Sequence, residues 1–375
     1  MNQPTRLAGQ GDILTEVHGQ VGFITLNRPK ALNALSLSMV RELLATLQSW
    51  CDNPALQAVA IRGTNKVGRP GSPESLFGGF CAGGDIRFFH RAALAADPAL
   101  DDFFTAEYTL NHLIHSYPKP LIVFMDGIVM GGGMGIGQGA SVRIVTEQTR
   151  MAMPETNIGL FPDVGGGYFL SRCPGRVGEY LALTGDVIGA DDAVAFGLAD
   201  VNIEAARLPA LWEALAAQSF SGTAEANAWI ATNLIADYER PVWAGSQFDK
   251  YFSLLRVKHM VDALEASPDA WAQKTAATLR KRSPLMLHVT LEQIRRARTM
   301  GLADELRMER GMMHHCFHGR PGASSEAVEG IRALAIDKDF HPRWQPARIE
   351  DVKPAMVAAF FESPWPADAH PLRAL

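Results

Sequence analysis

Short apolar runs typical of strands alternate with longer amphipathic stretches typical of helices through about residue 203. The strand-like runs include 21–26, 58–61, 121–125 and 142–146. This alternation predicts the α/β fold class. From Leu208 onward the strand signals fade, and apolar residues such as Leu287, Leu291 and Ile294 fall at helical spacing. The sequence therefore predicts an α/β core over 1–205 and a mostly helical C-terminal region over 206–375.

Capping and breaking residues give the expected helices their limits. Asn33 or Ser36 can cap a helix that buries Met39, Val40, Leu43, Leu44 and Leu47. A second long helix is expected over 103–115, ended by the prolines at 118 and 120. The stretch 64–79 is rich in Gly, Pro and Ser, so it is expected to be a surface loop, either a mobile cover or a passive insertion.

Composition narrows the class of protein. The chain has 375 residues, of which 47% are hydrophobic, and this is enough for a large core. Its net charge of −5 argues against general nucleic-acid binding. No apolar run approaches the ~18 residues needed to span a bilayer, and the N-terminus resembles neither a secretory nor a transit peptide. Four scattered cysteines are expected to be reduced thiols. A cytoplasmic location without membrane partners is the expectation.

Two glycine-rich turns are candidates for binding a developing negative charge. One is Phe80-Cys81-Ala82-Gly83-Gly84-Asp85, and the other is Gly131-Gly132-Gly133. Glycine lets backbone N–H groups approach a ligand without a Cβ in the way. Two such groups, from separate turns near helix starts, would form an oxyanion hole. The alternative is that these glycines only allow turns or close helix packing.

The segment 153–167 adds two acids, Glu155 and Asp163, among apolar and glycine residues. A carboxylate in an apolar setting is costly unless it is paired, hydrogen-bonded or functional. Acid/base or nucleophilic work beside an anion-stabilising site is therefore the functional reading. The alternative is that both acids merely cap turns or helix starts.

These motifs together resemble the crotonase (enoyl-CoA hydratase/isomerase) superfamily. The resemblance rests on 27–35 (NRPKALNAL), 80–86 (FCAGGDI) and the glycine run within 127–133. It implies a crotonase-type spiral of ββα units and an acyl-CoA substrate. It also implies that the peptide N–H groups of Ala82 and Gly132 hold the thioester oxygen. Further expected contacts are, for the substrate, Gly83, Gly84, Asp85 and Gly131, and for CoA, Arg28, Lys30, Ala31, Leu32 and Lys338.

Within the superfamily the sequence is most similar to the 3-hydroxyisobutyryl-CoA hydrolase branch. Segment 153–168, the pair Glu107-Tyr108 and the tail segments 336–339 and 342–347 carry this match. The resemblance implies hydrolysis of a short 3-hydroxyacyl-CoA, as in valine breakdown. Glu155 would be the nucleophile or the general base, and Asp163 would orient the hydroxyl or water or handle its proton. Glu107 would line the acyl pocket; an exposed helix acid is the alternative.

One departure separates this chain from the hydratases, which are the first alternative. Hydratases of this superfamily carry a Glu three residues after the middle glycine of the turn, and here that position is Gly135. Hydration uses two carboxylates to hold and deprotonate one water. Hydrolysis needs one carboxylate and a thiol leaving group, with a pKa near ~8.5. The departure favours the hydrolase.

Other chemistry is less well supported. Gly135 to Ala140 formally fits the GxGxx[GA] pattern of an NAD-dependent dehydrogenase, but the strand expected from Val142 leaves no room for the helix that this fingerprint opens. His314, His315, Cys316 and His318 include metal-ligating types, yet their spacing puts only some on one face. We expect no metal and no cofactor besides the CoA of the substrate. A homo-oligomer is possible.

Overall fold

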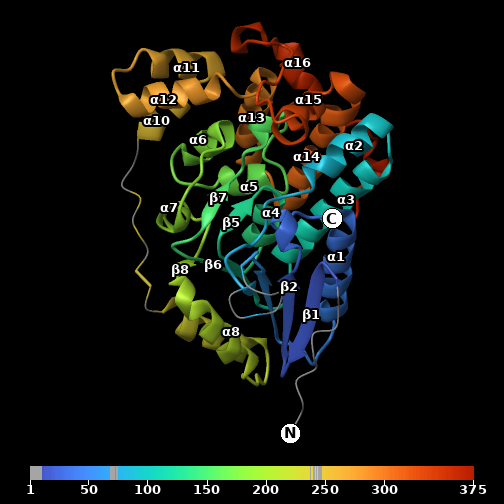
Figure 1. Cartoon of the computed structure of the whole chain (residues 1–375), viewed down its shortest axis with the longest axis vertical. Coiled ribbons are helices and arrows are strands. Elements are labelled where there is room, and N and C mark those ends of the chain that lie inside the picture. Colours follow the sequence, from blue (N-terminus) through green and yellow to red (C-terminus); the bar gives the residue numbers. More distant parts are fainter. Residues whose placement is uncertain are drawn as a thin grey trace. The chain divides into compact units, whose positions relative to one another are not determined.

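The computed structural model describes residues 11–67, 72, 75–236, 238–239, 241, 243 and 247–375 (Figure 1). Part of the expected loop 64–79 therefore lies outside the described residues. Chain contacts divide the protein into two compact units. Unit 1 comprises Met1–Gly84, Thr109–Met151 and Val187–Trp243, and unit 2 comprises Asp85–Tyr108, Ala152–Asp186 and Ala244–Leu375. The division of the sequence at residue 205 marks where strands give way to helices, and as a domain boundary it stays a prediction.

Unit 1 is built on a mixed sheet with the strand order β1-β2-β3-β4-β6-β8. β1 and β2 form an antiparallel hairpin, and the other neighbouring strands pair in parallel. A separate small sheet pairs β5 with β7. The strands are β1 (Ile13–His18), β2 (Val21–Leu26), β3 (Ala58–Gly63), β4 (Leu121–Met125), β5 (Ile128–Met130), β6 (Val142–Val145), β7 (Arg150–Ala152) and β8 (Val201–Asn202).

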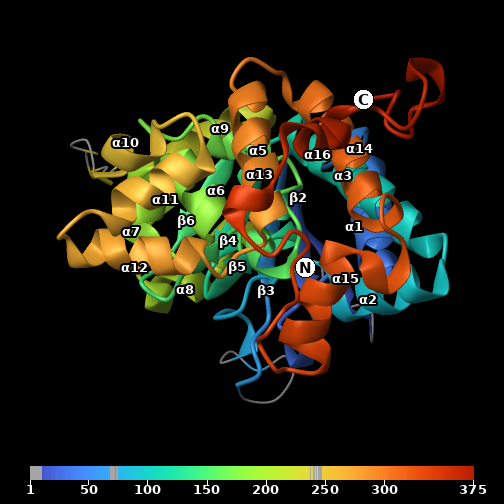
Figure 2. The same cartoon turned by 90° about the horizontal axis from the view of Figure 1, so that it is seen from above.

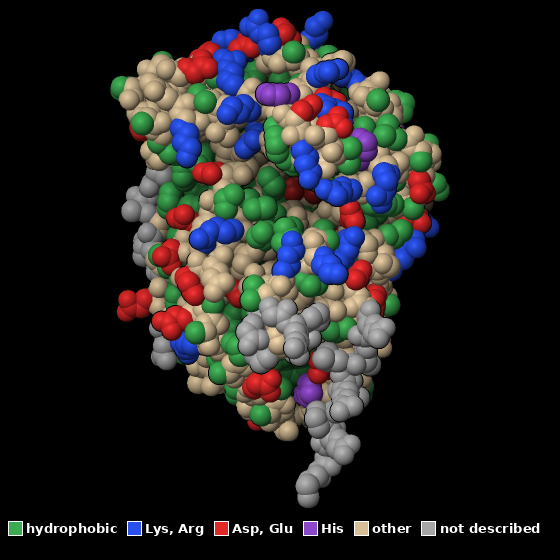
Figure 3. Space-filling model, in the orientation of Figure 1, with side chains coloured by type: hydrophobic (Ala, Val, Ile, Leu, Met, Phe, Trp, Pro, Cys, Tyr) green, Lys and Arg blue, Asp and Glu red, His purple; other side chains and the backbone are tan. Residues whose placement is uncertain are grey.

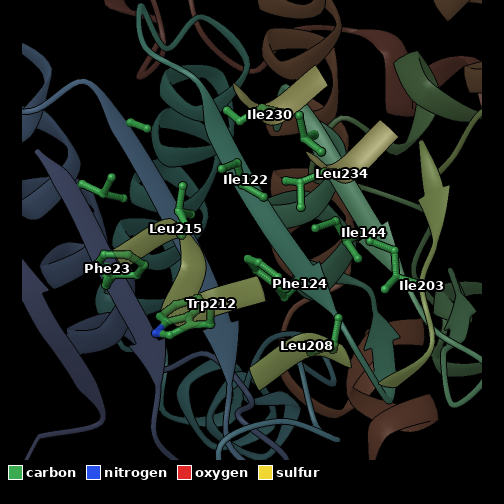
Figure 4. Packing of buried hydrophobic residues seen from close by; sticks show 14 of the residues in the cluster. Phe23, Ile122, Phe124, Ile144, Ile203, Leu208, Trp212, Leu215, Ile230 and Leu234 are labelled. Atoms are coloured by element: carbon green, nitrogen blue, oxygen red, sulfur yellow. The ribbon is translucent and has the colours of Figure 1, made fainter. Parts of the chain in front are cut away.

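Helices surround this sheet in unit 1. They are α1 (Leu37–Cys51), the C-terminal part of α3 (Ala99–His115), α4 (Gly132–Gln138), α7 (Ala190–Ala195), α8 (Leu208–Ala216) and α9 (Thr223–Ile230). Figure 4 shows alternate residues of the strands meeting α8 and α9. The Trp212 ring lies 4.7 Å from Phe23 and 5.4 Å from Phe124, between ring centroids. Burying each such side chain stabilises the unit by roughly 1.5–3 kcal/mol.

Unit 2 is helical. Its helices are α2 (Ile86–Ala95), the N-terminal part of α3, α5 (Gly166–Leu170), α6 (Val177–Thr184), α10 (Gln247–Phe252), α11 (Val257–Glu265), α12 (Ala270–Leu279), α13 (Pro284–Ala297), α14 (Leu302–His318), α15 (Glu326–Ile331) and α16 (Pro354–Ala358). Within it, α13 packs against α5 and α6, and α14 packs against α5 and α15 (Figure 2). These contacts position the site described below.

The predicted order of strands and helices is confirmed. The α/β class is correct, the expected strands are β2, β3, β4 and β6, and the region after residue 208 is mostly helical. Ser36 caps α1, because its hydroxyl accepts a hydrogen bond from the Met39 N–H at 3.3 Å. The alternative cap, Asn33, has another role.

Among the described residues no helix is both long and apolar enough to cross a membrane. On the face drawn in Figure 3, Lys and Arg side chains are interspersed with Asp and Glu.

Candidate active site

The two predicted glycine turns lie against each other within unit 1. The Cys81 N–H donates to the Ile128 carbonyl at 2.9 Å, and the Met130 N–H donates to the Cys81 carbonyl at 3.0 Å. A Cβ added to Gly133 would lie 2.3 Å from the Cys81 oxygen, so only glycine allows this approach. Gly83 adopts φ +104°, and a Cβ added there would lie 3.6 Å from the Gly132 nitrogen. The structure thus brings the segments of Ala82 and Gly132 together.

The two predicted oxyanion donors differ in their present partners. Gly132 is the first residue of α4, where a peptide N–H has no acceptor one turn earlier in the helix. The Ala82 N–H instead donates to the Leu32 carbonyl at 3.0 Å. A thioester oxygen bound at Ala82 would have to share this N–H with Leu32 or displace its carbonyl.

Asn33 holds the first glycine turn in place. Its side-chain amide donates to the carbonyl oxygens of Thr64 and Gly79, both at 2.8 Å, and of Phe80 at 3.0 Å. Its Oδ1 accepts from the Arg28 N–H at 2.8 Å. Asn33 is fully buried, with φ 54°. In this chain the Asn33 side chain therefore ties residues 28, 64, 79 and 80 together.

The residues expected to contact CoA differ in their exposure and in their hydrogen-bond partners. The Arg28 guanidinium donates to the Ala34 carbonyl at 2.8 Å and lies 4.0 Å from the Asp12 carboxylate, so part of its hydrogen bonding is structural. Lys30 and Leu32 are exposed, whereas Ala31 is half-buried. Lys338 is exposed in unit 2, with φ 59°.

Both predicted catalytic acids and Glu107 are buried in unit 2. Their exposed fractions are 2% for Glu107, 6% for Glu155 and 7% for Asp163. The Tyr108 hydroxyl donates to Asp163 Oδ2 at 2.8 Å. Glu107 Oε1 and Glu155 Oε2 are buried with no hydrogen-bond partner among the described residues. The reading of Glu107 as an exposed helix acid is therefore wrong, and the turn-capping reading leaves the burial of Glu155 and Asp163 unexplained.

Glu155 begins a short 3₁₀ turn, η3 (Glu155–Ile158), which neighbouring helices hold tightly. Ser283 donates its N–H to the Thr156 carbonyl at 3.1 Å, and Arg282 donates to Asn157 Oδ1 at 2.6 Å. Gly159 ends the turn with φ +72°, and a Cβ there would lie 2.2 Å from the backbone oxygen of Glu326. The backbone that carries Glu155 is thus fixed by α13 and α15.

Burial and mutual repulsion make these acids hard to ionise. Burial, followed by the charge of Glu309, raises the pKa of Asp163 from 3.8 to about 7, against the hydrogen bond from Tyr108. Burial, then the charges of Asp163 and Glu309, raises the pKa of Glu155 well above its usual value. The pKa of Glu107 is raised in the same way, by burial and then by Asp163, Glu155 and Glu309. Groups coupled this closely titrate together.

Sequence reasoning named Tyr108 without giving it a role, and it missed Gln293, Glu305 and Glu309. Both glutamates are fully buried on α14, at the spacing of its apolar positions Leu302, Leu306 and Met313. Burial raises the pKa of Glu305 to about 7. Both glutamates lie on the apolar face of their helix, and an acid at such a position in the sequence indicates a buried carboxyl group.

Asp85 lies at the start of α2, where its carboxylate accepts from the Phe88 N–H at 3.2 Å. This bond caps the helix, so Asp85 has a structural role besides the substrate contact that the resemblance implies.

The histidine cluster puts only His314 and His318 on one face, as its spacing predicts. With Asp101 they offer ligand atoms within 4.8 Å of one another. His315 instead contacts the Glu362 carbonyl at 2.7 Å. The buried Arg310 guanidinium donates to the Asp101 carboxylate at 2.5 Å and so competes with any cation there.

The dinucleotide pattern is also explained by local structure. Gly135 and Gly137 lie inside α4, and Gly139 is its C-cap. The glycines of a dinucleotide fingerprint open a helix. Here they lie within a short helix and at its end, which removes the support for the dehydrogenase alternative.

Comparison with known proteins gives consistent matches along the chain. The enoyl-CoA hydratase/isomerase family profile matches residues 21–361. A mitochondrial 3-hydroxyisobutyryl-CoA hydrolase of Xenopus tropicalis is 37% identical over 359 residues, which are 94% of this chain and 89% of the relative.

Two solved structures are similar to this chain over nearly its whole length. The crystal structure of a carnitinyl-CoA dehydratase from Mycobacterium thermoresistibile is 36% identical, with a TM-score of 0.81, and covers 96% of this chain and 98% of its own. An enoyl-CoA hydratase from Rhodobacter sphaeroides 2.4.1 is 34% identical, with a TM-score of 0.79, and covers 94% and 98%.

Proposed function

Because the chain belongs to the enoyl-CoA hydratase/isomerase family, we propose that it hydrolyses 3-hydroxyisobutyryl-CoA and related short 3-hydroxyacyl-CoA thioesters to the free acid and CoA. The observation that carries this proposal is the buried Glu155 carboxylate. Its pKa is raised by burial and by Asp163, and one of its oxygens has no partner among the described residues. Hydrolase relatives with this similarity over nearly the whole chain support the substrate class.

The proposed reaction begins with attack at the thioester carbonyl carbon. Either the Glu155 carboxylate attacks it and forms a mixed anhydride that water then cleaves, or Glu155 takes a proton from a water molecule that attacks. In both routes the C–S bond breaks, the sulfur leaves as a thiolate that is then protonated, and one water molecule is consumed. In the direct route water supplies the oxygen of the new acid, whereas the anhydride can be cleaved by water at the acyl carbon or at the Glu155 carboxyl carbon. The peptide N–H groups of Gly132 and Ala82 would hold the oxygen that becomes negative. Losing one such donor typically costs roughly 3 kcal/mol.

Asp163 is suited to handle a proton. Because burial and Glu309 raise its pKa to about 7, it exchanges a proton near neutral pH. We assign it to the substrate hydroxyl or to the proton of the water, with Glu107 at the acyl group. The exposed Lys30 and Lys338 are the bases proposed for the CoA phosphates. The reaction as proposed uses groups of the chain, the substrate and water, and it calls on no metal or redox cofactor.

The test is thiol release from 3-hydroxyisobutyryl-CoA, run beside loss of enoyl absorbance from crotonyl-CoA. We expect thiol release and little hydration. Hydration without thiol release would instead support the hydratase, the second candidate, which the similarity to the enoyl-CoA hydratase from Rhodobacter sphaeroides 2.4.1 favours.

Substitution of Glu155 tests its role. Glu155→Gln should lower kcat by about 10²–10⁴-fold or more. Asp200→Asn, at a half-buried carboxylate of unit 1 that accepts from the Arg143 N–H at 2.8 Å, is the control and should keep most activity. A folded Glu155→Gln enzyme with near-normal kcat would refute the assignment. A single turnover in ¹⁸O-water tests the nucleophilic route, because label enters the Glu155 carboxylate only when water cleaves a mixed anhydride at the Glu155 carboxyl carbon.

A further inference from the structure

Glu309 holds the backbone of the segment that contains Asp163. Its Oε2 accepts a hydrogen bond from the Gly165 N–H at 2.8 Å, and its Oε1 accepts one from the Gly167 N–H at 3.2 Å. Glu309 is fully buried on α14, 142 or more residues further along the chain. Two peptide donors are the partners that a buried carboxylate needs when no cation faces it.

Gln293 on α13 also binds this segment and Glu309. Its side-chain amide donates to Glu309 Oε1 at 2.9 Å and to the Pro162 carbonyl at 2.7 Å. Gln293 and Glu309 thus contact the backbone on both sides of Asp163. Gln293 is itself fully buried, so neither contact is exchanged for one with solvent.

The glycines of this turn are required by the approach of these side chains. A Cβ on Gly167 would lie 2.2 Å from Glu305 Oε1 and 3.0 Å from the Gln293 amide nitrogen. Gly165 adopts φ +85°. Val164, which follows Asp163 directly, adopts φ 57°, a conformation that a β-branched residue disfavours. A backbone of this kind persists only where its surroundings impose it.

We propose that Glu309 is a positioning residue for Asp163, acting through the peptide N–H groups of Gly165 and Gly167. This inference rests on the proposed function, which assigns Asp163 to thioester hydrolysis. Glu309 itself is assigned no contact with substrate. The glycines that follow Asp163 allow the side chains of α13 and α14 to approach the backbone of this turn.

Glu309 also acts on Asp163 through its charge. After burial, the charge of Glu309 is the largest cause that raises the pKa of Asp163, and it raises the pKa of Glu155 as well. The titratable groups that interact with Asp163 are Glu107 and Tyr108 on α3, Glu155 on η3, and Glu305, Glu309 and Cys316 on α14. The pKa of Glu309 is itself raised well above its usual value, by burial and then by the charge of Glu305, so Glu309 repels Asp163 in its ionised form. Removing that charge should make the remaining acids easier to ionise.

The test is Glu309→Gln in the full chain. The amide keeps one oxygen as acceptor but turns its NH₂ toward the other peptide N–H, so one hold on the turn is lost. We expect kcat to fall by roughly 10- to 100-fold, with KM changed less than about threefold. The acid limb of the kcat–pH profile should move to lower pH. Hydrogen exchange at the Gly165 and Gly167 amides should become faster.

Two further variants separate position from charge. Glu309→Asp keeps the charge on a shorter side chain, so the acid limb should stay in place while kcat falls. Asp200→Asn again serves as the control and should leave both the acid limb and the two glycine amides unchanged.

The outcomes distinguish this inference from the proposed function. Unchanged exchange at Gly165 and Gly167 in Glu309→Gln would overturn the inference, whatever the activity. The inference would also be overturned if the acid limb did not move and kcat fell no more than the amount of folded protein did. If the wild-type protein releases no thiol, the proposed function fails, while the exchange experiment still reports on the hold itself. Should Glu309→Gln not fold, Glu309→Asp decides the same question by exchange.

Discussion

Replacing Asp163 by Asn should make the protein more resistant to unfolding at alkaline pH while impairing the proposed reaction. The folded structure raises the pKa of this acid from 3.8 to about 7. Between these values the folded protein binds more protons than the unfolded chain, so its stability falls as pH rises. The stabilising effect of the protonated acid is complete below about pH 4 and is lost as pH passes 7. Asn has no charge to bury, so the variant lacks this loss.

The size of the effect follows from the shift. About three pH units at ~1.4 kcal/mol each give roughly 4 kcal/mol over the whole range. About two-thirds of this, close to 3 kcal/mol, falls between pH 5 and pH 8.5. The Tyr108 hydroxyl, which lies 2.8 Å from Asp163 Oδ2, can donate equally to the Asn oxygen, so its hydrogen bond is kept.

The assay is urea unfolding of both proteins at several pH values from 5 to 8.5, followed by fluorescence. The difference in free energy of unfolding, variant minus wild type, should grow in favour of the variant by about 3 kcal/mol across this range. Asp351→Asn, at an exposed carboxylate, is the control and should follow the wild type at every pH. A constant difference between Asp163→Asn and wild type would refute the reasoning, because it would mean that Asp163 ionises alike in the folded and unfolded chain.

Four other substitutions test the local arguments. Tyr108→Phe removes the hydrogen bond that lowers the pKa of Asp163, so the acid limb of the kcat–pH profile should move to higher pH. Gly159→Ala should destabilise the protein by about 3 kcal/mol or more in urea unfolding, because its Cβ would meet a backbone oxygen at 2.2 Å. Gly322→Ala, with a similar positive φ but open space, should cost only about 1–2 kcal/mol. Asn33→Ala leaves three carbonyls without their donor and should cost about 1–3 kcal/mol by the same assay.

The order of the elements was predictable because its causes are local. The run from Val21 to Leu26 is apolar except for Thr25 and is buried at every position as β2. The spacing from Met39 to Leu47 predicts the buried face of α1, and Ser36 precedes it as the cap. Both signals are complete within a few turns of chain, so no knowledge of distant contacts is required.

The surroundings of the site were not predictable in the same way. Gly165 and Glu309 meet across 144 residues of sequence, and Tyr108 meets Asp163 across 55. Nothing near Glu309 distinguishes it from a solvated acid except that it lies on the apolar stripe of its helix. Asn33 shows the same limit, since its local pattern fits a helix cap while its partners lie 31 to 47 residues away.

The buried acids of unit 2 destabilise the folded protein at alkaline pH, yet their burial also adjusts their pKa values for proton transfer. Each added charge makes the next ionisation harder, so the cluster keeps protons at neutral pH that isolated carboxyls would have released. A base works best when its pKa lies near the working pH, and burial brings Asp163 to about 7. The same burial that lowers alkaline stability therefore gives the proposed hydrolase a group that exchanges a proton at neutral pH. A variant that gains alkaline stability because one acid has been neutralised should also lose activity if that acid transfers a proton in the reaction. For Asp163→Asn, the unfolding and kinetic measurements should therefore change together.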